Sequence, residues 1–221
     1  MTEIDKYKLE DVKVAIVDDH EVVLEGFKSY IQRSGITHVE AFSRVQPMLD
    51  RIPSHPFQVY IVDVELMDVD VSWLIDEIRR LDTNARIIIN TMHEEMWVVS
   101  MMTEKKVDGV MYKSANLDQL LVAIKAVLSG RQFFCTKFKK AQNRLLAHND
   151  ILTKREQEIL VAIAKGYSTK EISTRFYISE NTVETHRQNI FLKLKAHNMA
   201  DLMIKAIAAG YINPQEIAGA G

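Results

Sequence analysis

Short apolar runs alternate with amphipathic stretches over the first part of the chain, up to residue 130. The runs predict strands at residues 12–17, 39–42, 59–62, 87–90 and 110–112. Apolar residues at helical spacing predict helices near residues 22–34, 45–52, 72–81, 95–104 and 117–128. Strands that alternate with helices are typical of a parallel sheet covered on both faces. The pattern therefore predicts a doubly wound α/β fold with a five-stranded parallel sheet.

Helix-start signals are concentrated after residue 150. Thr153 with Glu156, and Ser168 with Glu171, have the spacing of capping boxes. Gly166 can end the first of these helices before the second begins. These signals predict a second, all-α domain.

A third helix in this region can begin after Ser179, whose side chain can cap it. Val183, Ile190 and Leu194 recur at helical spacing and are expected to face a core. The side chains that then point outward are polar: Glu184, Thr185, Arg187, Gln188 and Lys193. A polar face on the second of two closely joined helices suits the major groove of DNA, although the pattern alone also fits a small bundle with a solvated charged face.

The length of 221 residues allows two domains, each with a core of its own. We predict the α/β domain at residues 11–131, a linker at 132–150 and a helix-turn-helix domain at 151–216. The linker contains no Gly or Pro, and its segment FKKAQNRLL is expected to add one or two helical turns.

The net charge of −2 is unevenly distributed along the chain. Residues 1–131 contain 15 Lys+Arg and 22 Asp+Glu, residues 132–150 contain 4 and 1, and residues 151–221 contain 9 and 7. An acidic first part and a mildly basic last part fit a regulatory domain joined to one that binds a polyanion. Because a domain of charge +2 neutralises few DNA phosphates, we expect two copies to bind together.

Several classes of protein are disfavoured by the sequence. No apolar run approaches the length of a membrane span, and the charged N-terminus is unlike a secretory signal, so we expect no membrane association and a cytoplasmic location. Cys135, as the single cysteine, cannot form an internal disulfide, and the histidines lack zinc-ligand spacing.

Polar residues follow four of the five predicted strands. Asp18 and Asp19 follow the first strand, Asp63 the third, Thr91 the fourth and Lys113 the fifth. Sites in parallel sheets lie at the carboxyl ends of the strands, and crowded carboxylates favour a hard cation such as Mg²⁺. Asp63 could then act as a nucleophile toward a phosphoryl group, whose oxygens Thr91 and Lys113 would contact. Each residue taken alone also fits a solvated loop position; their occurrence together favours a site.

The last part of the chain resembles the all-α, four-helix LuxR/GerE-type helix-turn-helix DNA-binding domain of NarL/FixJ-type response regulators. The resemblance covers residues 152–212 and rests on these positions: Leu152, Thr153, Arg155, Glu156, Glu158, Leu160, Gly166, Ser168, Lys170, Glu171, Ile172, Ile178, Ser179, Thr182, Val183, His186, Asn189, Ile190, Lys193, Leu194, Ala200, Gly210, Tyr211 and Ile212. The first part, from residue 12 to about 130, is similar to a receiver domain at Asp18, Asp19, Asp63, Thr91 and Lys113, with His20 and Gly26 also fitting.

The resemblance implies a two-component transcription regulator. Its phosphoacceptor would be Asp63, phosphorylated by a sensor histidine kinase, with Mg²⁺ held by Asp18, Asp19, Asp63 and the backbone carbonyl of Glu65. Its partner would be double-stranded DNA, bound as a homodimer. The DNA-contacting positions would be Glu184, Thr185 and Gln188 toward bases, and Thr182, Arg187 and Lys193 toward phosphates.

Glu184 departs from the lysine that is common in the family. A carboxylate can accept from cytosine N4, whereas lysine favours guanine, so we expect a different operator. Alternatively, Glu184 only stabilises the positive N-terminal end of its helix.

Further departures surround the expected phosphorylation site. After Asp63, the family usually has Met-Pro and then Gly, where this chain has Leu66-Met67 and Val71. Lys113 is followed by Ser114 instead of the usual Pro or Asp. Val110 occupies the position of the usual switch aromatic, so that Tyr112 is the nearest aromatic residue. They leave open a DNA-binding regulator that works without phosphorylation, its degenerate receiver serving dimerisation or sensing. A hydrolase with Asp63 as nucleophile and Glu65 as general acid would need a substrate-capping insertion, which the sequence lacks. We expect no metabolic enzyme.

Overall fold

A computed structural model describes residues 8–148 and 151–218. The chain forms two compact units, the first from residues up to 93 and 105–138, the second from 94–104 and 139 onward. Within the described ranges, no helix combines the length and the apolar character needed to cross a bilayer.

The first unit is built on a parallel sheet of six strands in the order β2-β1-β3-β4-β5-β6. The strands are β1 (Lys13–Val17), β2 (His38–Phe42), β3 (Val59–Val62), β4 (Arg86–Thr91), β5 (Gly109–Tyr112) and β6 (Phe133–Phe134). The predicted parallel sheet is confirmed, but the predicted number of strands was one too few. The missed strand, β6, lies in the segment predicted as a linker and is too short to show an alternating pattern.

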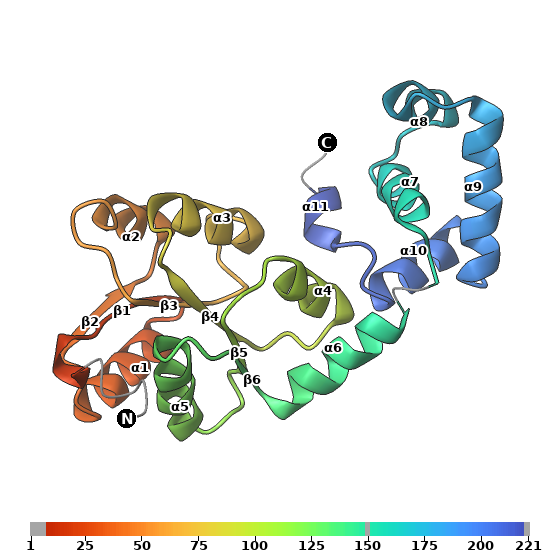
Figure 1. Cartoon of the computed structure of the whole chain (residues 1–221). Helices are drawn as coiled ribbons and strands as arrows, with labels where there is room; N and C mark the ends of the chain where they lie inside the picture. Colours follow the sequence, from red (N-terminus) through yellow and green to blue (C-terminus); the bar gives the residue numbers. More distant parts are fainter. Residues whose placement is uncertain (1–7, 149–150, 219–221) are drawn as a thin grey trace. The chain divides into compact units, whose positions relative to one another are not determined.

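Helices cover both faces of this sheet, as Figure 1 shows, with α2 and α3 on one side and α1 and α5 on the other. Their bounds are α1 (Glu21–Arg33), α2 (Val45–Arg51), α3 (Val71–Leu81) and α5 (Leu117–Leu128), preceded by a 3₁₀ turn, η2 (Leu9–Asp11). Phe27 and Ile31 of α1 pack with Ile124 of α5 and with Ile16 and Ile61 of the sheet. The doubly wound prediction is therefore confirmed.

The segment after the sheet is more regular than the sequence predicted. It forms α6 (Thr136–His148), a helix of 13 residues where one or two turns were expected. Phe138 in its first turn is buried, and the ring centroid of Phe138 lies 5.2 Å from that of Phe134. The start of α6 is thus packed beside the last strand of the sheet.

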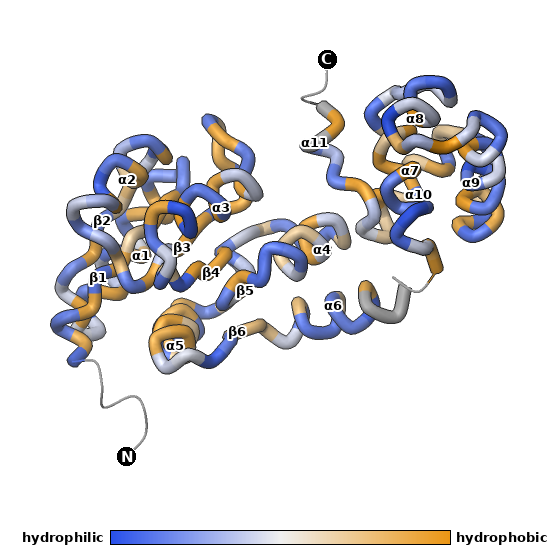
Figure 2. The backbone as a smooth tube through the Cα atoms, turned by 45° about the horizontal axis from the view of Figure 1, so that its top comes forward, coloured by the Kyte–Doolittle hydropathy of each residue, from blue (hydrophilic) through white to orange (hydrophobic). Residues whose placement is uncertain are grey.

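The second unit is helical. Its further elements are α4 (Met96–Glu104), α7 (Lys154–Ala164), α8 (Thr169–Phe176), α9 (Glu180–Lys193), α10 (Met199–Ala208) and α11 (Pro214–Ala218). Both predicted capping boxes are present, at the starts of α7 and α8. The Ser179 side chain accepts from the Thr182 N–H at the start of α9. Val183 and Ile190 are fully buried and Leu194 is partly buried, as predicted. Figure 2 shows that α5 is largely hydrophobic, whereas α9 is mostly hydrophilic.

Candidate functional site

Three of the predicted site residues meet at the carboxyl end of the sheet. Val17 of β1 pairs with Val62 of β3, so Asp18 and Asp63 directly follow neighbouring strands. Both carboxylates are buried, at 2% and 3% exposure. Lys113, which follows β5, places its Nζ 2.8 Å from Asp18 Oδ2 and donates to Asp63 Oδ2 at 2.7 Å. One ammonium group therefore bridges two buried carboxylates.

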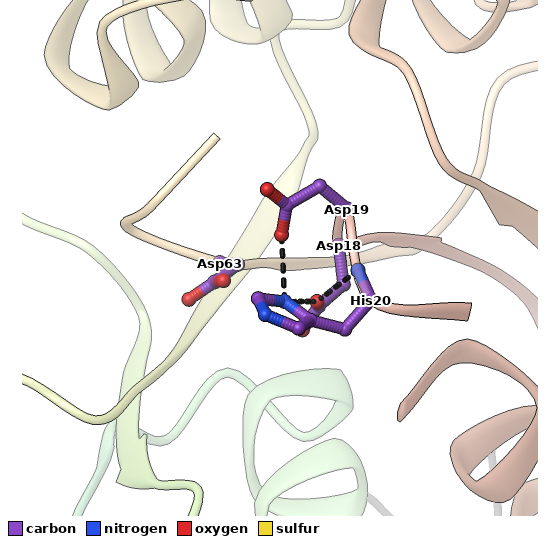
Figure 3. A group of neighbouring side chains, drawn as sticks. All are labelled: Asp18, Asp19, His20 and Asp63. Carbon is purple, nitrogen blue, oxygen red and sulfur yellow. Dashed lines mark hydrogen bonds and ion pairs between the residues drawn. The ribbon is translucent and has the colours of Figure 1, made fainter. Parts of the chain in front are cut away.

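Asp19 completes the acidic cluster. Ligand atoms of Asp18, Asp19, His20 and Asp63 all lie within 4.8 Å of one another, and Figure 3 shows their side chains converging. Asp19 Oδ1 is buried, and His20 Nδ1 lies 2.7 Å from it. Three carboxylates gathered this closely suit a hard, oxygen-preferring cation such as Mg²⁺.

His20 was not predicted as a metal ligand, yet it lies within the cluster. Its Nδ1 is 3.1 Å from Asp18 Oδ1, and its backbone N–H donates to the same oxygen at 2.9 Å. The sequence signal was its position directly after two acids at a strand end. The imidazole therefore borders the space in which a cation among the carboxylates would lie.

Burial and Lys113 shift the pKa of Asp63 in opposite directions. Burial raises the pKa of the Asp63 carboxyl, the hydrogen bond and charge of Lys113 oppose this, and the net shift is upward. Burial alone would lower the pKa of Lys113, but its bonds to Asp18 and Asp63 outweigh burial and raise it. The crowded carboxylates would thus be further stabilised in their ionised forms by a second positive charge.

Thr91 and Glu65 occupy different environments. Thr91 is fully buried at the end of β4, and its Oγ1 accepts from the His93 backbone N–H at 2.9 Å. The Glu65 side chain is exposed and lies with its Oε1 2.6 Å from His93 Nε2, outside the carboxylate cluster. Metal binding by the Glu65 backbone carbonyl stays a prediction.

Asn90 was missed as a candidate. It is only 1% exposed, and neither its Oδ1 nor its Nδ2 has a hydrogen-bond partner among the described residues. Because Val62 pairs with Ile89, Asn90 is the residue of β4 next to Asp63. An amide directly after the apolar run Ile87–Ile89, and directly before Thr91, was the available signal.

Tyr112, the aromatic residue next to Lys113, contacts Lys137 at the start of α6. Val110 is fully buried in β5, and Tyr112 is 5% exposed. Lys137 Nζ lies 5.7 Å from the centroid of the Tyr112 ring, a cation–π arrangement. The Tyr112 side chain, two residues after Val110, therefore contacts the first turn of α6.

The predicted DNA-contacting residues all belong to α9. Glu184, Thr185, Gln188 and Lys193 are exposed, and Thr182 and Arg187 are half-buried. Local bonds hold several of them: Thr185 Oγ1 donates to the Asn181 carbonyl at 3.0 Å, and the hydroxyls of Thr182 and Ser179 lie 2.8 Å apart. The face is polar, as the sequence predicted.

Two of these residues have partners that the sequence did not indicate. Glu184 Oε1 accepts from the Thr169 hydroxyl of α8 at 2.7 Å and lies 3.7 Å from Arg187 Nε. Lys193, expected to contact DNA phosphates, donates to Glu156 Oε2 at 2.6 Å. Its charge therefore serves packing between α7 and α9, and its contact with DNA stays a prediction.

Comparisons with known proteins agree with this architecture. Residues 14–125 match the model of the response regulator receiver domain, and residues 150–206 match that of bacterial regulatory proteins of the luxR family. The chain is 30% identical over 222 residues to the oxygen regulatory protein NreC of Staphylococcus aureus, covering 89% of this chain and 97% of NreC. It is 28% identical over 196 residues to a putative transcriptional regulator of Pseudomonas aeruginosa, covering 86% and 95%.

A solved structure shows the same fold. The two-component response regulator RcsB in its DNA complex matches with a TM-score of 0.63 and 23% identity, covering 88% of this chain and 96% of that one. The chain therefore belongs to the luxR family of bacterial regulatory proteins, as a response regulator whose receiver domain precedes a LuxR-type DNA-binding domain.

Proposed function

We propose that a sensor histidine kinase phosphorylates this regulator on Asp63 and that phosphorylation controls its binding to double-stranded DNA as a homodimer. The observation that carries the proposal is the bridge from Lys113 to the buried carboxylates of Asp18 and Asp63. A buried nucleophile beside a fixed ammonium group suits transfer of a phosphoryl group, whose oxygens need positive charge.

In the proposed transfer, one oxygen of Asp63 forms a bond to phosphorus. The P–N bond of the kinase phosphohistidine breaks, and its electron pair leaves with the imidazole. Lys113 and the Thr91 hydroxyl contact the phosphoryl oxygens. Asp18, Asp19 and Asp63 would hold Mg²⁺, which when bound supplies further positive charge to those oxygens.

The DNA-binding part of the proposal rests on α9. Its exposed polar face follows a capped start, and the preceding helix α8 is joined to it by a short turn, an arrangement suited to the major groove. Two copies would read half-sites about 10 base pairs apart or a multiple of that spacing. We place this activity in the cytoplasm, and the protein would be a regulator rather than a metabolic enzyme.

Phosphoryl uptake from acetyl phosphate tests the proposal. The intact protein should gain the mass of one phosphoryl group in the presence of Mg²⁺, and the gain should disappear when Mg²⁺ is chelated. Asp63→Asn should abolish uptake, whereas Asp50→Asn, on an exposed position of α2, should retain it. Unchanged uptake by the Asp63 variant would remove Asp63 as the acceptor.

A second candidate function is supported by the residues that replace the usual switch. Val71 begins α3 fully buried, and Val110 is fully buried in β5, so neither offers the aromatic or glycine that the family commonly uses. A regulator that acts without phosphorylation would dimerise and bind DNA equally well with and without beryllofluoride. The phosphorylation-controlled regulator would bind DNA more tightly when beryllofluoride is present.

A further inference from the structure

Asn90 extends the row of buried polar residues formed by Asp18 and Asp63. Val17 pairs with Val62, and Val62 with Ile89. Asp18 directly after β1, Asp63 directly after β3 and Asn90 within β4 therefore stand in line. Neighbouring strands lie about 4.8 Å apart, so Asn90 is the next side chain after Asp63 along this row.

The three side chains also face the same side of the sheet. Ile16, Ile61 and Ile88, each two residues before one of them, pack in the cluster that joins the sheet to α1 and α5. Residues two apart in a strand face the same side. The Asn90 amide is therefore directed to the side of the sheet on which Asp63 lies.

An amide at this position is costly unless it has a partner in some state of the protein. Ile88 shows that an apolar side chain suits this strand and face, and Asn90 is as deeply buried as Ile88. A buried polar group without a hydrogen bond destabilises the folded protein. The resting structure thus contains a donor beside Asp63 that is not in use.

Both carboxylate oxygens of Asp63 already accept hydrogen bonds from other donors in the resting structure. Lys113 donates to its Oδ2 at 2.7 Å, and the Val64 backbone N–H donates to its Oδ1 at 2.7 Å. Phosphorylation changes this, because one oxygen becomes bonded to phosphorus and the other becomes a neutral carbonyl. The Lys113 ammonium is then drawn from the carboxyl group to the more negative phosphoryl oxygens.

We propose that Asn90 is a positioning residue that donates from Nδ2 to the Asp63 carbonyl oxygen once Lys113 has moved to the phosphoryl group. The inference rests on the proposed phosphorylation of Asp63. With acetyl phosphate as donor, the Asp63 oxygen bonds to phosphorus, the P–O bond to the acetyl group breaks, and acetate leaves with the electron pair. The hydrogen bond from Asn90 then favours the phosphorylated state over the resting one.

Asn90→Leu tests this inference, because it should change stability and phosphoryl-analogue binding in opposite directions. Replacing an unpaired amide with an apolar group should raise the urea midpoint of unfolding without Mg²⁺. The affinity for beryllofluoride at saturating Mg²⁺, followed by ¹⁹F NMR, should fall about two- to tenfold, the range expected for one ordinary hydrogen bond. The ¹⁹F shift of the bound analogue should also change. Asn90→Val provides a second apolar variant if the leucine does not fit.

Ile88→Val is the matched control, since it alters the same face of the same strand away from Asp63. It should lower stability slightly and leave beryllofluoride affinity unchanged. The inference is overturned if both Asn90 variants bind beryllofluoride as the wild type does, or if both are less stable, which would mean that the amide is already satisfied at rest. Wild-type protein that takes up no phosphoryl group would instead refute the proposed function itself.

Discussion

Lys193 near the end of α9 donates to Glu156 in the first turn of α7, at 2.6 Å between Nζ and Oε2. The same oxygen accepts from the backbone N–H and the hydroxyl of Thr153, at 2.8 and 2.9 Å. Glu156 is only 3% exposed. A residue that forms a local capping box thus also joins two helices of the DNA-binding domain.

Glu156→Gln should lower the free energy of unfolding of this domain by about 1–2 kcal/mol at pH 7, because it removes the ion pair and weakens the cap. Urea unfolding followed by circular dichroism measures the loss. Glu158→Gln is the control: Glu158 pairs with Arg155 on the surface and should change stability by less than about 0.5 kcal/mol.

The effect of Glu156 should depend on pH. Burial would raise the pKa of Glu156, but the hydrogen bonds from Lys193 and Thr153 outweigh it and lower the pKa below its ordinary value of 4.5. A carboxyl group whose pKa is lower in the folded state than in the unfolded state stabilises the protein at pH values above the unfolded-state pKa. This stabilisation is lost as the pH falls through the folded-state pKa. The stability difference between wild type and Glu156→Gln should therefore narrow below pH 4.5. A difference that stays constant into this range would contradict the assignment.

Lys113→Met should impair both stability and phosphoryl uptake. It leaves the buried carboxylates of Asp18 and Asp63 without their shared cation, which should cost roughly 3 kcal/mol without Mg²⁺. Added Mg²⁺ should restore part of this loss. Uptake from acetyl phosphate should slow about 100-fold, the usual effect of losing one charge-stabilising donor. Lys139→Met, at an exposed position of α6, should change neither property, and equal behaviour of the two variants would refute the role of Lys113.

Glu184→Lys should change the preferred operator. A lysine favours guanine where a carboxylate accepts from cytosine, and a good base contact discriminates by about 1–3 kcal/mol. Binding-site selection on random DNA measures the change, with Glu180→Lys as a control that should strengthen binding without altering base preference. An unchanged preference for Glu184→Lys would assign Glu184 to its contact with the Thr169 hydroxyl.

Tyr177→Gly should stabilise the DNA-binding domain. Tyr177 ends α8 in the left-handed region, with φ 54°, and its side chain is 95% exposed, so little packing is lost on its removal. Glycine removes the cost of the left-handed conformation, but it also makes the unfolded chain more flexible. The net gain in the free energy of unfolding should be about 0.5–1 kcal/mol. Tyr177→Ala keeps the conformational cost and should give no gain. Equal stability of the glycine and alanine variants would show that the backbone there is not strained.

Features encoded by neighbouring residues were predictable from the sequence. The capping boxes at Thr153 and Ser168 need only a partner three residues later, and both form. Parallel strands bring their carboxyl ends to one edge, so the meeting of Asp18, Asp63 and Lys113 could be expected from the strand pattern.

Features that depend on distant residues were not predictable in the same way. The bond between Lys193 and Glu156 joins positions 37 apart, and an outward-facing lysine on a helix gives no sign of it. The pairing of Phe133 and Phe134 with β5 is likewise set by the folded sheet rather than by a local pattern. His20 and Asn90 were overlooked because each is a single polar residue whose meaning comes from its neighbours in space.

The short strand β6 determines where an isolated receiver fragment should end. It pairs with Gly109 and Val110 of β5, and a side chain at Gly109 would come within 3.3 Å of the Phe133 carbonyl oxygen. A fragment cut at residue 131 would leave the outer backbone of β5 open, and an uncovered apolar edge promotes aggregation between molecules. Expression of the receiver alone therefore calls for an endpoint beyond Phe138, whose buried ring lies beside this edge.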